Sequence, residues 1–294
     1  MFLKVVEDEK KMLNFLRYFW RLYNKLRRHF KVWYRSLLKS SFKYFDLKKD
    51  QNDLKINLGA GQWWLRHWYN LDAPFGVRSY KKNFIDYPFD LCSQDKLPFS
   101  DGTVRMFYSS HCIEHIPQKH LEHVFNECYR SMKLGGVIRL TTPDFDKACD
   151  AFEQQDEEFF IRTCSRTGTG EYTYTTDDFS IEQKFIYYFA GALSEQISDV
   201  EVAKLYKEMG RYKFADKILE NLELNKIGAT AGEVGYHSNW FGFEKLKSML
   251  EGAGFSDVRR CSRSGSRFEE MRKPKSYFDQ SYPKISLYVE ARKL

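Results

Sequence analysis

Apolar and polar positions follow two different periods along the chain. Over residues 10–40 the apolar positions recur every three or four residues beside a separate basic stripe, which predicts an amphipathic helix. After residue 53, short apolar runs alternate with segments of helical period, which predicts a mostly parallel sheet flanked by helices. The predicted strands are 54–58, 67–71, 83–86, 103–109, 136–142, 257–262 and 285–291.

Glycines mark the ends of two predicted helices. One helix covers 119–133 and stops before Gly135 and Gly136. The other covers 243–252 and is stopped by Gly252 and Gly254. Each helix is followed by a predicted strand, as expected for an alternating α/β chain.

The alternation of strands and helices is lost between residues 151 and 235, where the sequence is polar and partly helical. This segment follows the fifth predicted strand, at the end of the sheet where open α/β folds bind ligands. We therefore predict a basic amphipathic helical extension over 1–50 and one α/β domain over 51–294. Within that domain, 151–235 is predicted to be a lid or acceptor-binding insertion.

Positive charge is concentrated at the N-terminus. Residues 1–50 hold fourteen Lys and Arg against five acids, whereas the rest of the chain holds thirty-three against thirty-five. A basic amphipathic helix over 10–40 suits peripheral association with an anionic membrane, and it equally suits packing on the domain or on a second copy. The basic excess stops at residue 50, which argues against nucleic acid as a partner. The sequence does not assign an oligomeric state.

Composition limits the class of protein. The chain has 294 residues, of which 43% are hydrophobic and 30% are charged, as in soluble globular proteins. No apolar run reaches membrane-spanning length, and the first residues lack a signal-peptide core. Six cysteines occur without a C-x-x-C pair, which is typical of reduced thiols. We expect a cytoplasmic protein, with membrane association through 10–40 as a further option.

A glycine turn and an acid suggest a nucleoside site. Gly59 and Gly61 follow the first predicted strand, where backbone N–H groups can approach a ligand closely, and Asp72 falls at the tip of the second strand. A carboxylate there can accept both hydroxyls of a ribose. A dinucleotide fingerprint would need a third glycine where Trp63 stands, and an acid about 20 residues on. A ligand without phosphates therefore fits better.

These residues carry a resemblance to a known family. The stretches "NLGAG", "WYNLD", "LPFSDGTVRMFYSSHCIEHI", "ECYRSMKLGGVIRLTTPD" and "WFGFEKLKSMLEGAGFSDV" resemble, in this order, class I S-adenosylmethionine-dependent methyltransferases of the type 11 group. The resemblance covers most of residues 54–294. It implies a Rossmann-like sheet, mostly parallel with an antiparallel last strand and helices on both faces, and S-adenosyl-L-methionine as the cofactor.

The resemblance also implies roles for individual residues. Gly59 and Gly61 would pass beside the methionine and ribose, and Asp72 would hold the ribose hydroxyls. Asp90 and Leu91 would face the adenine, with Asp95 as the alternative to Asp90, and Ser110 and His111 would border the methyl group. The sequence departs from the family pattern at Asn57, where many relatives have an acid, and at Trp63.

Methyl transfer is a displacement at a sulfonium methyl carbon, so the protein mainly aligns the acceptor and excludes water. A base helps when the acceptor is a hydroxyl or a protonated amine. His111 is the first candidate base, since imidazole titrates near neutral pH, and His237 is the second. The resemblance suggests a small-molecule, lipid or saccharide acceptor. Arg139 and Arg162 are candidates to contact an acidic substrate.

Two other functions compete with methyl transfer. His111, Glu114 and His115 spell the inverted zinc-protease motif H-x-x-E-H, which would make the protein a zinc-dependent hydrolase. Because His111 directly follows a strand and Ile116-Pro117 ends the helix at once, we predict no metal at this motif. The other alternative is a non-catalytic protein with a degenerate methyltransferase fold, which Asn57 and Trp63 make conceivable.

Overall fold

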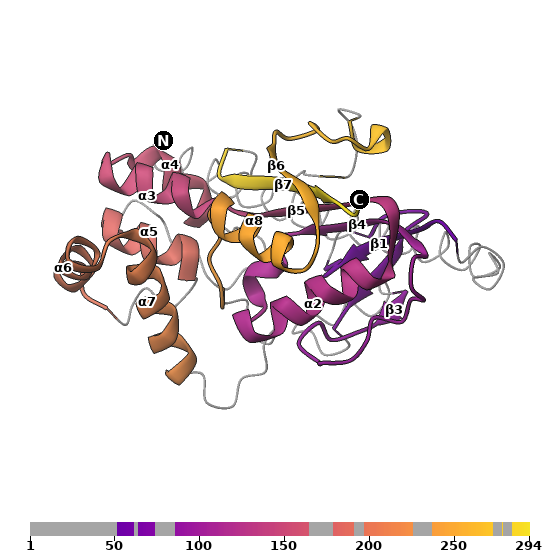
Figure 1. Cartoon of the computed structure of the whole chain (residues 1–294). Helices are drawn as coiled ribbons and strands as arrows, with labels where there is room; N and C mark the ends of the chain where they lie inside the picture. The colour runs from indigo at the N-terminus through magenta and orange to yellow at the C-terminus, as the bar shows by residue number, and fades with distance from the viewer. Residues whose placement is uncertain are drawn as a thin grey trace, which may run out of the picture. The chain divides into compact units, whose positions relative to one another are not determined.

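The residues that a computed structural model of the chain describes form one seven-stranded sheet, in the order β3-β2-β1-β4-β5-β7-β6 (Figure 1). All neighbouring strands are parallel except β7, which is antiparallel to both β5 and β6. This confirms the predicted mostly parallel sheet with an antiparallel last strand. The strands are β1 Leu54–Leu58, β2 Tyr69–Asp72, β3 Tyr87–Pro88, β4 Val104–Ser110, β5 Met132–Pro143, β6 Ser256–Cys261 and β7 Ser286–Arg292.

The structure describes residues 52–61, 64–73, 86–164, 179–190, 197–225, 237–272, 278 and 284–294. Contacts divide the chain into Met1–Asp50 and Gln51–Leu294. The first unit lies outside the described residues, and with it the predicted helix over 10–40. Trp63 also lies outside them. Within the described part, none of the helices has both the length and the apolar character needed to cross a bilayer.

The glycine pair at 135–136 lies inside β5 and does not end a helix, so that prediction was wrong. The preceding helix already ends at Ser131, and Met132 begins the strand with an extended backbone. Opposite β4, Val104 pairs with Met132 but Met106 pairs with Val137, so β5 carries extra residues between these two pairs. Gly135 has a φ of +78° in this irregularity, a conformation that glycine adopts without steric cost.

Two helices cover one face of the sheet, as Figure 1 shows: α2, Gln118–Ser131, and α8, Phe243–Gly252. Their apolar stripes include Leu121, Phe125, Leu246 and Leu250, all of them buried in the same core as the strand residue Phe107. On strand β4 the neighbours of Phe107 point to the opposite face, because side chains alternate along a strand. That face has its own core, formed by Leu65, Trp68, Met106, Tyr108, Val137, Met271 and Phe278.

A helical layer with an aromatic core follows β5. Its centre is Phe185, which has no exposed surface and stacks on Phe152 with ring centroids 4.6 Å apart. The Tyr188 hydroxyl donates to the carbonyl of Ile285 at 2.5 Å, which fastens the layer to the start of β7. The helices are α3 Phe145–Glu153, α4 Glu157–Cys164, α5 Ile181–Ala190, α6 Asp199–Met209 and α7 Arg211–Asn225.

Arg139 contributes to the core of the sheet and does not face a substrate site, so the hypothesis of a substrate contact was wrong for this residue. Arg139 on β5 lies opposite Glu290 on β7, and its Nη1 donates to Oε1 of Glu290 at 3.0 Å. Neither side chain has exposed surface. Burial alone would raise the pKa of Glu290, but hydrogen bonds from Ser266 and Arg267 and the charge of Arg139 hold it below its usual range. The Arg162 side chain lies outside the described residues.

We expect Glu290→Ala to lower the free energy of unfolding by about 3–5 kcal/mol, because it leaves the buried Arg139 guanidinium without its counter-charge. Replacing both residues, as in the double variant Arg139→Met with Glu290→Met, should cost less than Glu290→Ala alone. Urea denaturation followed by circular dichroism measures both. Glu122→Ala, on the exposed side of α2, is the control and should change the unfolding midpoint little. A loss for Glu290→Ala no larger than the control's would contradict the importance of this pair.

Candidate functional site

The strand order reverses between β1 and β4, which lie side by side at the centre of the sheet. In open α/β sheets such a reversal opens a crevice at the carboxyl ends of the strands, where ligands bind. Here the carboxyl ends of β1, β2 and β4 bring Gly59, Asp72 and Ser110 to one edge. The sequence-predicted cofactor residues therefore meet at the place where this topology can hold a ligand.

The glycine turn after β1 is packed against the turn after β4. Gly59 and Gly61 have φ of +63° and +51°, which L side chains rarely adopt. A Cβ on Gly59 would lie 2.1 Å from Sγ of Cys112, so a side chain cannot fit there without a shift. Around Gly61 there is more room, since the nearest atom to a Cβ would be the Gly59 carbonyl oxygen at 3.9 Å.

Asp72 holds the glycine turn in place from the end of β2. Its Oδ2 accepts a hydrogen bond from the Gly61 backbone N–H at 2.8 Å, and its Oδ1 accepts one from the Ala73 N–H at 2.9 Å. The Ala60 N–H also donates to the Leu71 carbonyl at 2.9 Å. Because each carboxylate oxygen can accept two hydrogen bonds, this arrangement is compatible with a diol bound at the same carboxylate.

The segment after β3 lies beside Asp72 through the backbone. The Phe89 N–H donates to the Asp72 carbonyl at 2.9 Å, which sets Asp90 next to the end of β2. The exposed Asp90 side chain accepts from the Cys92 N–H, and Leu91 packs against the main core. Asp95 instead lies near α2, where its carbonyl accepts from His123. Of the two alternatives for the adenine-facing acid, Asp90 is the one that follows a residue bonded to Asp72.

Asn57, in the middle of β1, takes part in an internal amide network. It is 2% exposed, and its Nδ2 donates to Oδ1 of Asn70 at 2.9 Å. Asn70 in turn accepts from the Leu65 N–H and donates to the carbonyls of Leu65 and Trp68. A neutral amide at this point therefore holds the loop between β1 and β2.

His111 follows β4 in a left-handed conformation, with φ of +49°, and its N–H donates to the Thr141 carbonyl at 2.8 Å. A non-glycine residue held there is strained, and such strain is often found at functional sites. Its Nδ1 lies 3.2 Å from Oε1 of Glu114, and its Nε2 lies 3.0 Å from Oγ of Ser286. The imidazole is thus fixed on both sides beside Ser110, the last residue of β4.

His237 joins a cluster with Glu114 and His115, and Glu114 in turn contacts His111. One ligand-type atom from each of these three residues lies within 4.8 Å of the others. Burial, reinforced by His115, lowers the pKa of His237 to about 3. Such an imidazole is a poor proton acceptor near neutral pH, so His111 is the better placed of the two predicted bases.

Glu114 is buried, with 1% of its surface exposed. Burial raises its pKa, but the hydrogen bond from His111 and the charges of His111, His115 and His237 outweigh this and bring the pKa to about 2. The carboxylate also accepts from Thr142 Oγ1 at 3.3 Å. The sequence motif contained Glu114 and His115, but the 122-residue separation gave no sign that His237 would join them.

The inverted zinc-protease arrangement is not formed. Glu114 and His115 lie on η2, a single 3-10 turn covering Ile113–His115, and Ile116 is already extended. His111 precedes this turn and is paired with Glu114 and Ser286. Two histidines of the motif therefore do not share one face of an α-helix, as that motif requires.

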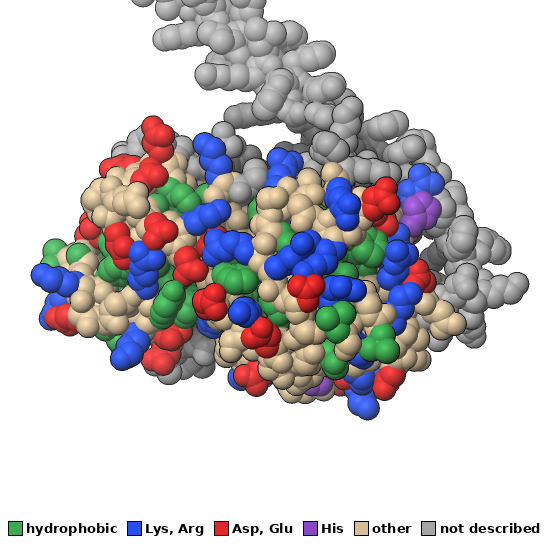
Figure 2. Space-filling model, turned by 45° about the horizontal axis from the view of Figure 1, so that its top comes forward, with side chains coloured by type: hydrophobic (Ala, Val, Ile, Leu, Met, Phe, Trp, Pro, Cys, Tyr) green, Lys and Arg blue, Asp and Glu red, His purple; other side chains and the backbone are tan. Residues whose placement is uncertain are grey.

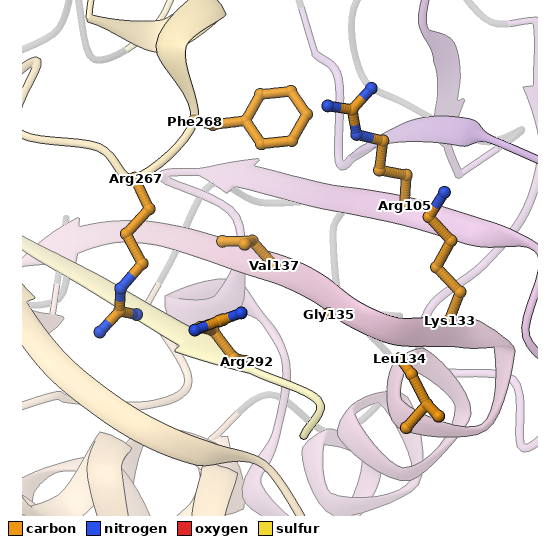
Figure 3. Close-up of a pocket in the computed structure, with 8 residues that line it drawn as sticks. All are labelled: Arg105, Lys133, Leu134, Gly135, Val137, Arg267, Phe268 and Arg292. Carbon is orange, nitrogen blue, oxygen red and sulfur yellow. The ribbon is translucent and has the colours of Figure 1, made fainter.

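A basic pocket of about 400 Å³ lies at the other end of β4 and β5 (Figure 3). It is lined by Arg105, Lys133, Arg267 and Arg292, with the ring of Phe268 facing the Arg105 guanidinium at 4.7 Å. Arg105 and Lys133 share Asp53 as counter-charge, and Arg267 and Arg292 share Asp257. Figure 2 shows the same interleaving of basic and acidic side chains over one face of the described residues.

Residues 69–140 match a family model described as a methyltransferase domain. No curated protein matches the sequence. Among solved structures, a SAM-dependent methyltransferase from Archaeoglobus fulgidus is 13% identical, with a TM-score of 0.38 and coverage of 88% of this chain and 94% of that one. A possible histamine N-methyltransferase from Thermotoga maritima is 11% identical, with a TM-score of 0.37 and coverage of 82% of both chains.

The matched residues run from β2 through most of β5 and so include Asp72, Asp90, Ser110 and His111. The strand order and the antiparallel β7 extend the same architecture to the rest of the domain. The family match over residues 69–140, together with this sheet topology, supports a class I S-adenosylmethionine-dependent methyltransferase with S-adenosyl-L-methionine as its cofactor.

Proposed function

We propose that the chain transfers the methyl group of S-adenosyl-L-methionine to a small-molecule, lipid or saccharide acceptor. The observation that carries this proposal is Asp72. Its carboxylate lies at the tip of β2, beside the reversal of strand order, and accepts from the Gly61 N–H at 2.8 Å. These contacts orient the carboxylate and support its role as the ribose ligand, and Gly59 and Gly61 would pass beside the cofactor.

The remaining site residues have roles that follow from their places. Asp90 and Leu91, bonded next to the end of β2, would face the adenine, and Ser110 would border the methyl group. When bound, the cofactor supplies an activated methyl group, so the chain's own task is to align the acceptor and to exclude water. His111 would contact the acceptor, and Glu114 would fix its ring orientation through Nδ1.

The helical layer after β5 supports an acceptor site at this edge. It begins directly after Pro143 with the Asp144 N-cap, and Tyr188 fastens it to the start of β7, next to Ser286 and hence to His111. We propose that this layer closes over the acceptor. The predicted membrane association of residues 10–40 would bring a lipid-linked acceptor within reach, and a cytoplasmic location remains our expectation for the domain.

We expect Asp72→Asn to weaken the binding of S-adenosylhomocysteine by about 10- to 100-fold, because a charged hydrogen-bond acceptor for the ribose is lost. Isothermal titration calorimetry measures this. Asp101→Ala is the control, since Asp101 lies on the loop before β4, its side chain is 80% exposed, and it pairs with Arg130 of α2. Equal affinities for Asp72→Asn and the wild type would contradict the assigned role. A wild-type protein that binds no S-adenosylhomocysteine at millimolar concentration would support the non-catalytic alternative.

Two glycine variants separate backbone strain from the steric contact at the site. Gly59→Ala and Gly102→Ala both place a side chain at a φ above +60°, but only the former meets another atom, Sγ of Cys112. We expect Gly59→Ala to lower the melting temperature more than Gly102→Ala and to abolish binding of S-adenosylhomocysteine. Gly102→Ala should retain wild-type affinity. Equal behaviour of the two variants would show that the Cys112 contact does not shape the site.

The acceptor class and the role of His111 can be tested together. Incubation with methyl-labelled S-adenosylmethionine and a fractionated cell extract should label one of the lipid, polysaccharide or low-molecular-weight fractions. With that fraction as acceptor, His111→Ala should lower kcat at least 100-fold while the affinity for S-adenosylhomocysteine stays within about threefold. His120→Ala, on α2, is the control. An unchanged kcat for His111→Ala would remove His111 from the mechanism.

A further inference from the structure

The cluster of Glu114, His115 and His237 has features that methyl transfer does not require. Its members come from the turn after β4 and from the segment that returns from the helical layer. The N–H groups of Ser238 and Asn239 both donate to the Glu114 carbonyl, at 2.7 and 3.0 Å. The position of His237 over η2 is therefore fixed by the backbone and does not depend on side-chain packing alone.

Glu114 is a buried carboxylate with imidazoles as its neighbours. Ionised groups are rarely buried without a compensating cation, and the buried Glu290, for example, pairs with Arg139. Around Glu114 the neighbouring side chains are those of His111, His115 and His237. Neutral imidazoles donate hydrogen bonds or coordinate cations, but they bring no net charge to offset the carboxylate.

The hydrogen bond of His237 decides which ring nitrogen carries the lone pair. Its Nδ1 lies 3.1 Å from the carbonyl oxygen of Phe189, and a carbonyl can only accept, so Nδ1 carries the hydrogen and Nε2 the lone pair. Metal-binding histidines commonly donate their second ring nitrogen to a backbone carbonyl in this way, which fixes the tautomer and the ring orientation.

We propose that Glu114, His115 and His237 bind one divalent transition-metal ion, with Zn²⁺ as the best match. Two imidazoles and one carboxylate are a zinc ligand set in which a fourth position stays open for water or another ligand. Bonds of roughly 2.0–2.2 Å place tetrahedral ligands roughly 3.4 Å apart. Binding would therefore draw the three ligand atoms, now within 4.8 Å of one another, closer together.

The site is tested on the full chain with Zn²⁺ alone, after removal of metal by EDTA and dialysis. We expect calorimetry to give close to one Zn²⁺ per chain, and a hundredfold excess of Zn²⁺ over its Kd to raise the melting temperature by roughly 5–10 °C. His237→Gln keeps a donor for the Phe189 carbonyl but loses the ring nitrogen. It and His115→Gln should each raise the Kd at least about tenfold, whereas His120→Gln should leave it unchanged.

A spectroscopic measurement keeps the proposal falsifiable if a variant folds poorly. Co²⁺ bound in place of Zn²⁺ should give the visible absorption bands of a low-symmetry site in the wild type, and these should be lost in His237→Gln. A wild-type protein with neither a Zn²⁺-induced shift of melting temperature nor a Co²⁺ spectrum overturns the proposal. So does stoichiometric binding that survives both His115→Gln and His237→Gln. S-adenosylhomocysteine affinity is measured separately, so a failure here leaves methyl transfer untouched.

Discussion

The close approach of Gly59 to Cys112 is the contact on which the candidate site depends. It joins the turn after β1 to the turn after β4, the two strands between which the sheet reverses its order. A residue with a Cβ would overlap Cys112 there, and two residues on, the Gly61 N–H donates to the carboxylate of Asp72. The contact of the Gly59 backbone with the Cys112 side chain thus joins the turn that Asp72 binds to the turn that carries His111.

The spacing of apolar residues and glycines was sufficient to predict elements whose bounds depend on neighbouring residues alone. The strand at 54–58 and the helix at 243–252 have the predicted bounds, because apolar periodicity and terminal glycines act over a few residues. The start of β5 was missed because Gly135 and Gly136 serve an irregularity in the strand, and a glycine pair signals a bulge as readily as a helix end.

Residues whose roles depend on distant partners could not be predicted. The sequence predicted a substrate contact for Arg139, but in the structure Arg139 pairs with Glu290 of β7, which lies 151 residues away in the sequence. Glu114 and His115 stand together in a sequence motif, but His237 lies 122 residues on and is held beside them where Ser238 and Asn239 bond to the Glu114 carbonyl. Asp72 was predictable for the opposite reason, since it follows the glycine turn by only 11 residues.

Two of the buried carboxylates, Glu290 and Glu114, show how one domain uses the same group in two ways. Glu290 is neutralised by an arginine whose charge is permanent, and the result is a fixed part of the sheet. Glu114 is surrounded by imidazoles, whose charge depends on their protonation or on a coordinated cation. Its Oε1 contacts His111, and its second oxygen accepts from Thr142 at the end of β5. The carboxylate of Glu114 therefore contacts both the histidine cluster and the imidazole of His111, which lies at the edge where the methyl acceptor would bind. A change in the surroundings of Glu114 would thus also act on His111.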